Sequence, residues 1–90
     1  MKFEWDPHKA EINFRKHGVS FDEAGSVFLD RRALSGPDPE HSVGESRYIT
    51  FGTSSLGRLL AVSHTYRPGA IRIITARRVT RGERTLYEEG

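Results

Sequence analysis

The sequence predicts an α+β fold in which helices gather around one mostly antiparallel sheet. Three observations carry this prediction. Two helix-start signals follow each other near the N-terminus, three β-rich segments separated by turn residues fill the second half, and a further helix-start signal lies near the C-terminus. The expected order is a strand, an N-terminal helical hairpin, three or four strands and a C-terminal helix.

Length and composition narrow the class of protein. A chain of 90 residues that is 36% hydrophobic and 29% charged predicts one soluble globular domain over residues 1–90. No stretch approaches the roughly 20 apolar residues that a membrane span needs. The first six residues carry acid and lack an apolar signal core, so we expect a cytoplasmic protein. The absence of cysteine excludes disulfides, thiolate metal sites and a cysteine nucleophile.

The first element is a short strand over residues 2–5, where polar and apolar residues alternate. A helix follows, because Asp6 can cap free N–H groups and Pro7 suits the first helical position. This helix is expected to run to about His17. Gly18 is well placed for the left-handed residue that commonly ends a helix.

The second helix is predicted by the capping-box pattern Ser20-x-x-Glu23. Together the two helices are expected to form a hairpin over one side of the sheet. Residues 32–36 read as a short strand. Residues 37–44 form a loop, because its two prolines break strand pairing.

Three strands follow over residues 45–53, 58–66 and 71–78, joined by turns at 54–57 and 67–70. The middle strand carries an apolar run on both of its faces, which predicts that it lies in the centre of the sheet. The last strand is rich in β-branched residues and also in arginine, so it must both pack and hold charge at the surface.

The final helix is predicted by a second capping box, Thr80-x-x-Glu83, and should extend towards Glu89 with Leu86 packing inward. The N-terminal end of a helix favours an anion such as phosphate. It lies next in the chain to the arginine-rich end of the last strand.

Positive charge is concentrated in one segment. Residues 63–84 hold six arginines and one glutamate, a net +5, whereas residues 1–62 carry −1 and the last six residues −2. Such asymmetry indicates a surface for a polyanion, most simply RNA. The alternative is a solvated charged face without a ligand.

Several segments carry a resemblance to a known family. They are Phe3-Glu4-Trp5-Asp6, Asn13-x-x-Lys16-His17-Gly18-Val19-Ser20-Phe21, Phe28 to Asp30, Pro37-Asp38-Pro39 to Glu45-x-Arg47, and Ile71-Arg72-Ile73-Ile74-Thr75-Ala76-Arg77-Arg78 to Glu83-Arg84. In this order the chain resembles BrnT-type toxins of bacterial type II toxin–antitoxin modules. The resemblance implies a RelE-like fold, RNA cleavage that arrests growth, and no cofactor.

The resemblance also implies partners. The expected partner is a BrnA-type antitoxin with a ribbon-helix-helix part, and operator DNA would be bound only through the complex. The family signature at the end of the sheet falls on Arg77, Arg78, Glu83 and Arg84. One departure is Gly82, where members more often carry a better helix former.

RNA can be cut without a metal ion when its 2′-hydroxyl attacks the adjacent phosphate. The protein must then supply a base, positive charge and an acid. Arg77 is the first candidate for the charge because a guanidinium holds two phosphate oxygens, with Arg67 and Arg78 in support. Proton transfer is assigned to His64 or Glu83. Substrate contacts are expected from a further set of cations: Arg72, Arg78, Arg81, Arg84 and Lys16.

Plainer interpretations stay open for these residues. His64 could simply fill the sheet, and Glu83 could serve only as the partner of Thr80 in the capping box. His41 lies in a loop with Asp38, but their spacing matches no standard metal-ligand pattern, so no metal site is predicted. At the level of function, the alternatives to an endoribonuclease are a non-catalytic nucleic-acid-binding module and a module that only binds an antitoxin.

Overall fold

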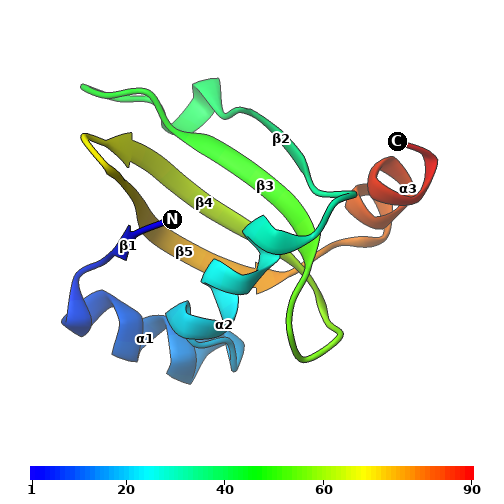
Figure 1. Cartoon of the computed structure of the whole chain (residues 1–90), viewed down its shortest axis with the longest axis horizontal. Helices are drawn as coiled ribbons and strands as arrows, with labels where there is room; N and C mark the ends of the chain where they lie inside the picture. The colour runs from blue at the N-terminus through cyan, green and yellow to red at the C-terminus, as the bar shows by residue number, and fades with distance from the viewer.

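The protein is described here from a computed structural model of residues 1–90 (Figure 1). Ten elements follow one another along the chain. They are β1 (Phe3–Glu4), α1 (Pro7–His17), α2 (Phe21–Ser26), the 3₁₀ turn η1 (Val27–Leu29), β2 (Leu34–Pro37), the 3₁₀ turn η2 (Pro39–His41), β3 (Tyr48–Thr53), β4 (Leu59–Arg67), β5 (Ala70–Arg78) and α3 (Arg81–Glu89).

The five strands form one mixed sheet in the order β1-β5-β4-β3-β2. β1 runs parallel to β5, and the other three pairings are antiparallel. The α+β class and the central position predicted for β4 are therefore confirmed. The N-terminal helical hairpin is not confirmed, because β1 precedes α1 and each of the two helices packs against β5.

The helix-start signals act locally as the sequence indicates. Asp6 accepts a hydrogen bond from the backbone of His8 at 2.9 Å, and Gly18 ends α1 with a φ of 68°. Ser20 caps α2 by accepting from the backbone of Glu23. The Glu23 carboxylate does not complete a capping box, because it is buried in an ion pair with Arg58.

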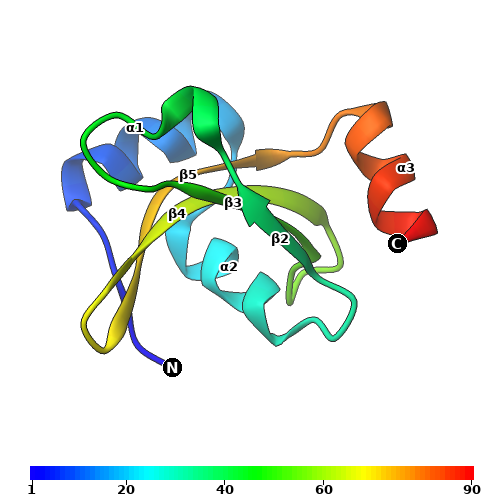
Figure 2. The same cartoon turned by 90° about the horizontal axis from the view of Figure 1, so that it is seen from above.

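One face of the sheet is covered by α2 and η1, and this is where the core lies. Figure 2 shows α2 on this side of the sheet, whereas α1 and the segment with η2 lie together on the other side of the strands. The core is formed by eight buried residues: Val19, Phe21, Ala24, Val27, Leu60, Val62, Ile73 and Ala76. On the opposite face of the sheet only α1, which packs against β5, and the segment with η2 lie over the strands, and we call it the open face.

An irregularity in β5 sets which arginines share the open face. Side chains alternate between the two faces of a regular strand, so Arg72 and Arg77, five residues apart, would point in opposite directions. The register slips beside Ser63 and His64 of β4, which leaves one extra residue in β5. Arg72 then pairs with Thr65 and Arg77 with Ala61, so both arginines lie on the open face.

The edge of β5 beyond β1 is closed by one side chain of α1. The Asn13 amide donates to the Ala76 carbonyl at 2.9 Å and accepts from the Ala76 N–H at 3.1 Å. It also donates to the Val19 carbonyl at 3.0 Å. Asn13 thus takes the place of a neighbouring strand and holds α1 against the sheet at this point.

The last helix begins with the capping box that the sequence predicts, because Thr80 and Glu83 each bond the other's backbone N–H. Tyr87 anchors it by donating to the Asp30 carboxylate at 2.6 Å. The prediction that Leu86 packs inward is wrong, since this side chain is 59% exposed. None of the helices has the length and apolar run that crossing a bilayer requires.

Candidate functional site

A hollow of about 360 Å³ lies on the open face, between α1, the segment 38–47 and the strands β4 and β5. Figure 2 shows that segment beside α1. The hollow is lined mainly by polar and cationic groups: Lys16, His17, Asp38, His41, Arg47, Ile49, Ser63, Ile74, Thr75 and Arg77. Cations in a concave surface are suited to an anion such as a phosphodiester.

Arg77 is the predicted site residue that lies in this hollow with its guanidinium held in place. Its Nη1 and Nη2 donate to the two carboxylate oxygens of Glu83 at 2.7 and 2.9 Å, and Nη1 also donates to the Arg78 carbonyl at 3.2 Å. This pairing lowers the pKa of Glu83 to about 2 and raises the pKa of Arg77. The capping box of α3 therefore positions the arginine by fixing its partner.

The geometry has a direct consequence for Glu83. Both of its oxygens are engaged by Arg77, and one of them also accepts from the backbone of Thr80 at 2.9 Å. A carboxylate with a pKa near 2 is a weak proton acceptor at neutral pH. Its position instead makes it an internal anion that a phosphate must displace, in whole or in part, to reach the fork of Arg77.

Replacing Glu83 by glutamine is expected to tighten RNA binding by roughly threefold to tenfold, about 1 kcal/mol, because it removes the competing charge and keeps a residue that the capping box accepts. RNA cleavage should persist. The measurement is RNA affinity and cleavage rate at fixed salt. A loss of rate of about 10²-fold or more with unchanged affinity would contradict this role, because the Glu83 carboxylate would then be required for the reaction itself.

Arg47 is a second cation of the hollow, and the sequence-based assignment missed it. Its Nε is buried without a hydrogen-bond partner, and unlike Arg72 and Arg77 it has no carboxylate partner. A buried donor without a partner is unfavourable and is commonly satisfied by a ligand or water. The sequence did contain a signal that could have identified Arg47, since this residue lies within one of the segments that carry the family resemblance.

The other predicted arginines occupy different places. Arg67 lies at the far end of β4 and is paired with Glu45 at 2.6 Å. Arg72 is paired with Glu4 at 2.9 Å and lines a smaller hollow of about 80 Å³, which Arg47 also lines. Arg72 is therefore next to the candidate site, whereas Arg67 is not among the residues that line it.

Of the remaining residues predicted to contact the substrate, one lines the hollow and three do not. Lys16 lines the hollow directly. Arg78 is paired with Leu60 in the register and so lies on the opposite face from Arg77. Arg81 and Arg84 are exposed on α3, and Arg84 is 3.9 Å from Glu88. These three residues are not among those that line the hollow.

His64 is separated from this site by the sheet itself. Its side chain is fully buried on the core face, where Nε2 lies 2.8 Å from the Thr50 hydroxyl and Nδ1 has no partner. The ring packs against Phe28 and Tyr66. Burial lowers the pKa of His64 to about 4, so it is neutral at physiological pH. The structure does not bring His64 together with Arg77.

This burial predicts a pH-dependent stability. The unfolded chain takes up a proton at His64 below its ordinary pKa of 6.5, whereas the folded protein does so only near 4. The free energy of unfolding should therefore fall by about 1–2 kcal/mol as the pH drops from 7 to 5. Urea unfolding at several pH values measures it. The His64→Gln variant should lose most of this slope, and the exposed control His8→Gln should keep it.

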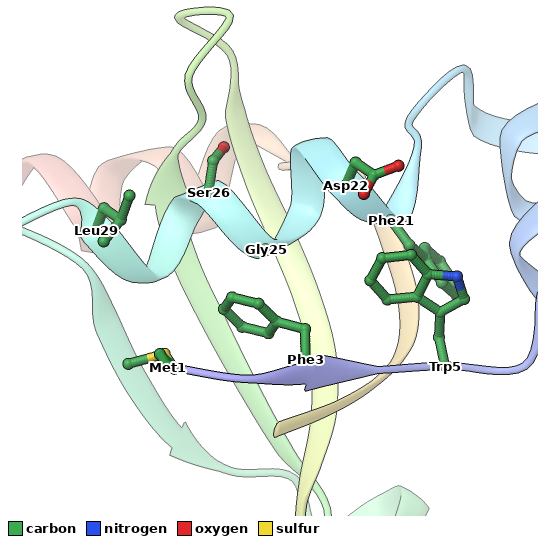
Figure 3. Close-up of a pocket in the computed structure, with 8 residues that line it drawn as sticks. All are labelled: Met1, Phe3, Trp5, Phe21, Asp22, Gly25, Ser26 and Leu29. Carbon is green, nitrogen blue, oxygen red and sulfur yellow. The ribbon is translucent and has the colours of Figure 1, made fainter. Parts of the chain in front are cut away.

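A second hollow, of about 460 Å³, has a different character. Figure 3 shows that it lies between β1 and α2, where Met1, Phe3 and Trp5 face Phe21 and Leu29. The one charged side chain in its lining is that of Asp22. An apolar hollow with a carboxylate does not attract phosphate, so the RNA-binding candidate is the cationic hollow on the open face.

Comparison with known proteins agrees with this fold. A family described as "Ribonuclease toxin, BrnT, of type II toxin-antitoxin system" matches residues 5–83. The crystal structure of the Brucella abortus ribonuclease toxin BrnT superposes with a TM-score of 0.69 at 23% sequence identity, and the match covers 90% of this chain and 99% of that one. No curated protein matches the sequence.

Proposed function

Since the chain belongs to the BrnT family of ribonuclease toxins from type II toxin–antitoxin systems, we propose that it arrests growth by cutting RNA without a metal ion at the hollow on the open face. The single observation that carries this proposal is that Lys16, Arg47 and Arg77 line one hollow of about 360 Å³ together with two histidines. The hollow therefore combines positive charge with imidazole groups that can transfer protons, which is what the 2′-hydroxyl route requires.

In the proposed reaction the RNA 2′-oxygen attacks the adjacent phosphorus, the bond to the 5′-oxygen breaks, and a 2′,3′-cyclic phosphate is left. Charge builds up on the phosphate oxygens as the fifth bond forms. Arg77 and Arg47 neutralise it, and Lys16 adds a third positive charge at the rim. Each position is fixed by the fold: Arg77 by Glu83, and Arg47 by a backbone bond from Asp38 to the Arg47 carbonyl at 2.8 Å.

The proposed path of the RNA strand extends beyond the hollow. Arg72 lines the adjoining smaller hollow together with Lys9 and Arg47, so it offers a contact to a neighbouring phosphate. Arg81 and Arg84 are exposed at the start of α3 and can attract the strand at longer range. The proposal gives no chemical step to His64, Glu83 or Arg67.

We further propose that residues 1–90 act as one toxin domain in the cytoplasm, where its RNA substrate is found. The proposed partner is a BrnA-type antitoxin with a ribbon-helix-helix part, and operator DNA is bound only by the complex of the two. Expression of the chain alone should then stop growth. Co-expression of the antitoxin should restore growth.

The decisive experiment is incubation of the purified protein with total bacterial RNA in EDTA. The expected result is cleavage at defined positions, with 2′,3′-cyclic phosphate at the new 3′ ends. Binding of RNA without cleavage would favour the non-catalytic alternative. Cleavage that requires added Mg²⁺ would contradict the metal-independent reaction, because the 2′-hydroxyl route needs only proton transfer and charge.

A further inference from the structure

The hollow contains a carboxylate–imidazole pair that the sequence-based assignment did not use. His41 Nδ1 lies 2.9 Å from an oxygen of Asp38, and both residues line the hollow. We propose that His41 is the base that takes the proton from the RNA 2′-hydroxyl, and that Asp38 is the residue that positions its ring. This proposal rests on the proposed ribonuclease function.

The pair fixes which nitrogen of His41 is free. An ionised carboxylate can only accept hydrogen bonds, so Nδ1 must carry the hydrogen that Asp38 accepts. In the neutral ring Nε2 is then the acceptor, with its lone pair available. The His41 side chain is 64% exposed, so Nε2 is accessible to an RNA strand in the hollow. Asp38 is only 19% exposed.

The role of Asp38 is not explained by local structure alone. It precedes the 3₁₀ turn η2 at the position where an aspartate commonly caps the backbone, yet its side chain makes no capping bond there. Its carboxylate is directed to His41 instead. In the same way a carboxylate in other catalytic sites holds an imidazole in one tautomer and stabilises the charged form that arises during the reaction.

The segment that carries the pair is tied by hydrogen bonds to Arg47, the residue that precedes β3. Ser42 Oγ donates to the Asp38 carbonyl at 2.7 Å and accepts from the Arg47 N–H at 2.9 Å. The Asp38 N–H donates to the Arg47 carbonyl at 2.8 Å. These bonds fix Asp38 relative to Arg47, so the base and a phosphate-binding cation share one rigid frame. Such positioning is a large part of catalytic power.

A comparison of the titratable groups of the hollow selects His41 over His17 as the base. Glu40 is its neighbour in the same segment, and the other charged or titratable residues of the hollow come from separate elements: Lys16 and His17 from α1, Arg47 ahead of β3, and Arg77 from β5. His17 has no side-chain partner to hold its ring in one tautomer. His41 does have one, which is why the role is assigned to His41.

The proposed step balances as follows. His41 Nε2 takes the 2′-hydroxyl proton while the 2′-oxygen forms its bond to phosphorus. The bond from phosphorus to the 5′-oxygen breaks, and that oxygen takes a proton from water in the open hollow. His41 then holds the positive charge, opposite the Asp38 carboxylate, until it returns its proton to solvent. Nothing is oxidised or reduced.

The test uses a synthetic RNA that carries one cleavage site mapped on total RNA, with EDTA present. His41→Ala is expected to lower kcat by about 10²–10⁴-fold. Added imidazole should restore part of that rate, because a small base can occupy the space left by the ring. Asp38→Asn should lower kcat by about tenfold or more at unchanged KM, and Asp38→Glu should recover part of the loss. The control His8→Ala, an exposed histidine on α1 that does not line the hollow, should match the native protein.

The outcomes separate two claims. If the native protein cleaves RNA and His41→Ala cleaves it equally fast, His41 is not the base and the ribonuclease assignment stands. The same conclusion follows if His41→Ala is slow, has native circular dichroism and RNA affinity, and does not respond to imidazole. If the native protein cleaves no RNA, the ribonuclease assignment itself fails, and the role of His41 with it. Binding of an analogue with a 2′-deoxy sugar at the cleavage site should be equal for native protein and His41→Ala.

Discussion

RNA cleavage by the Arg77→Ala variant is expected to be about 10²–10³-fold slower than by the native protein, at equal protein concentration and with EDTA present. A positioned donor that neutralises charge in the transition state typically contributes this much. Arg77 is the cation of the hollow whose guanidinium is held by two parallel bonds, at 2.7 and 2.9 Å, so its geometry is set before RNA arrives. The effect should fall mainly on kcat.

Two further variants distinguish geometry from charge. Arg77→Lys keeps the charge but not the planar fork, so it should recover only part of the rate. Arg31→Ala removes an exposed arginine in the turn between η1 and β2 and should leave the rate unchanged. Equal losses in Arg77→Ala and Arg31→Ala would mean that only net charge matters. That result would contradict a specific role for Arg77.

The largest expected effect on stability is that of Asn13→Ala, which should lower the free energy of unfolding by about 3 kcal/mol. The substitution deletes three hydrogen bonds and leaves the N–H and the carbonyl of Ala76 unpaired. Ala76 is fully buried, and each buried polar group without a partner costs about 1–3 kcal/mol. Urea unfolding followed by circular dichroism measures the change.

The matched control for this prediction lies on the same helix. Arg15→Ala removes a side chain that is 77% exposed and paired only with Glu11, one turn away. Exposed pairs of this kind contribute little, so its effect should stay within about 0.5 kcal/mol. A loss below about 1 kcal/mol for Asn13→Ala would show that the edge of β5 does not depend on this side chain.

Much of the fold could be predicted because its signals are local. The caps at Asp6, Ser20 and Thr80 mark the helix starts, and Gly18 marks a helix end, within a few residues of chain. The failures concern contacts between distant residues. Nothing near Glu23 in the sequence indicates that its carboxylate leaves the cap to pair with Arg58. The expected helical hairpin is not confirmed, because α1 and α2 each pack against β5.

The site was harder to predict for the same physical reason. Charge density in the sequence singled out Arg77, because six arginines are clustered in one segment, and Arg77 lines the hollow. His64 could not be placed, since its strand is apolar on both faces and the alternation does not show which face is covered. His41 and Arg47 lie some thirty residues before Arg77 in the chain. They come close to Arg77 only because β3 pairs with β4 and β4 pairs with β5.

The amide of Asn13 also affects how molecules of this protein can associate. Growth of a sheet into a fibre needs two long free edges, one to add each new neighbour. Here one margin is occupied by Asn13 and by a strand of only two residues, β1. The other margin is β2, which is four residues long and ends at Pro37, a residue without an N–H. Strand-by-strand polymerisation is therefore blocked from one side, and even a concentrated preparation should resist forming fibres.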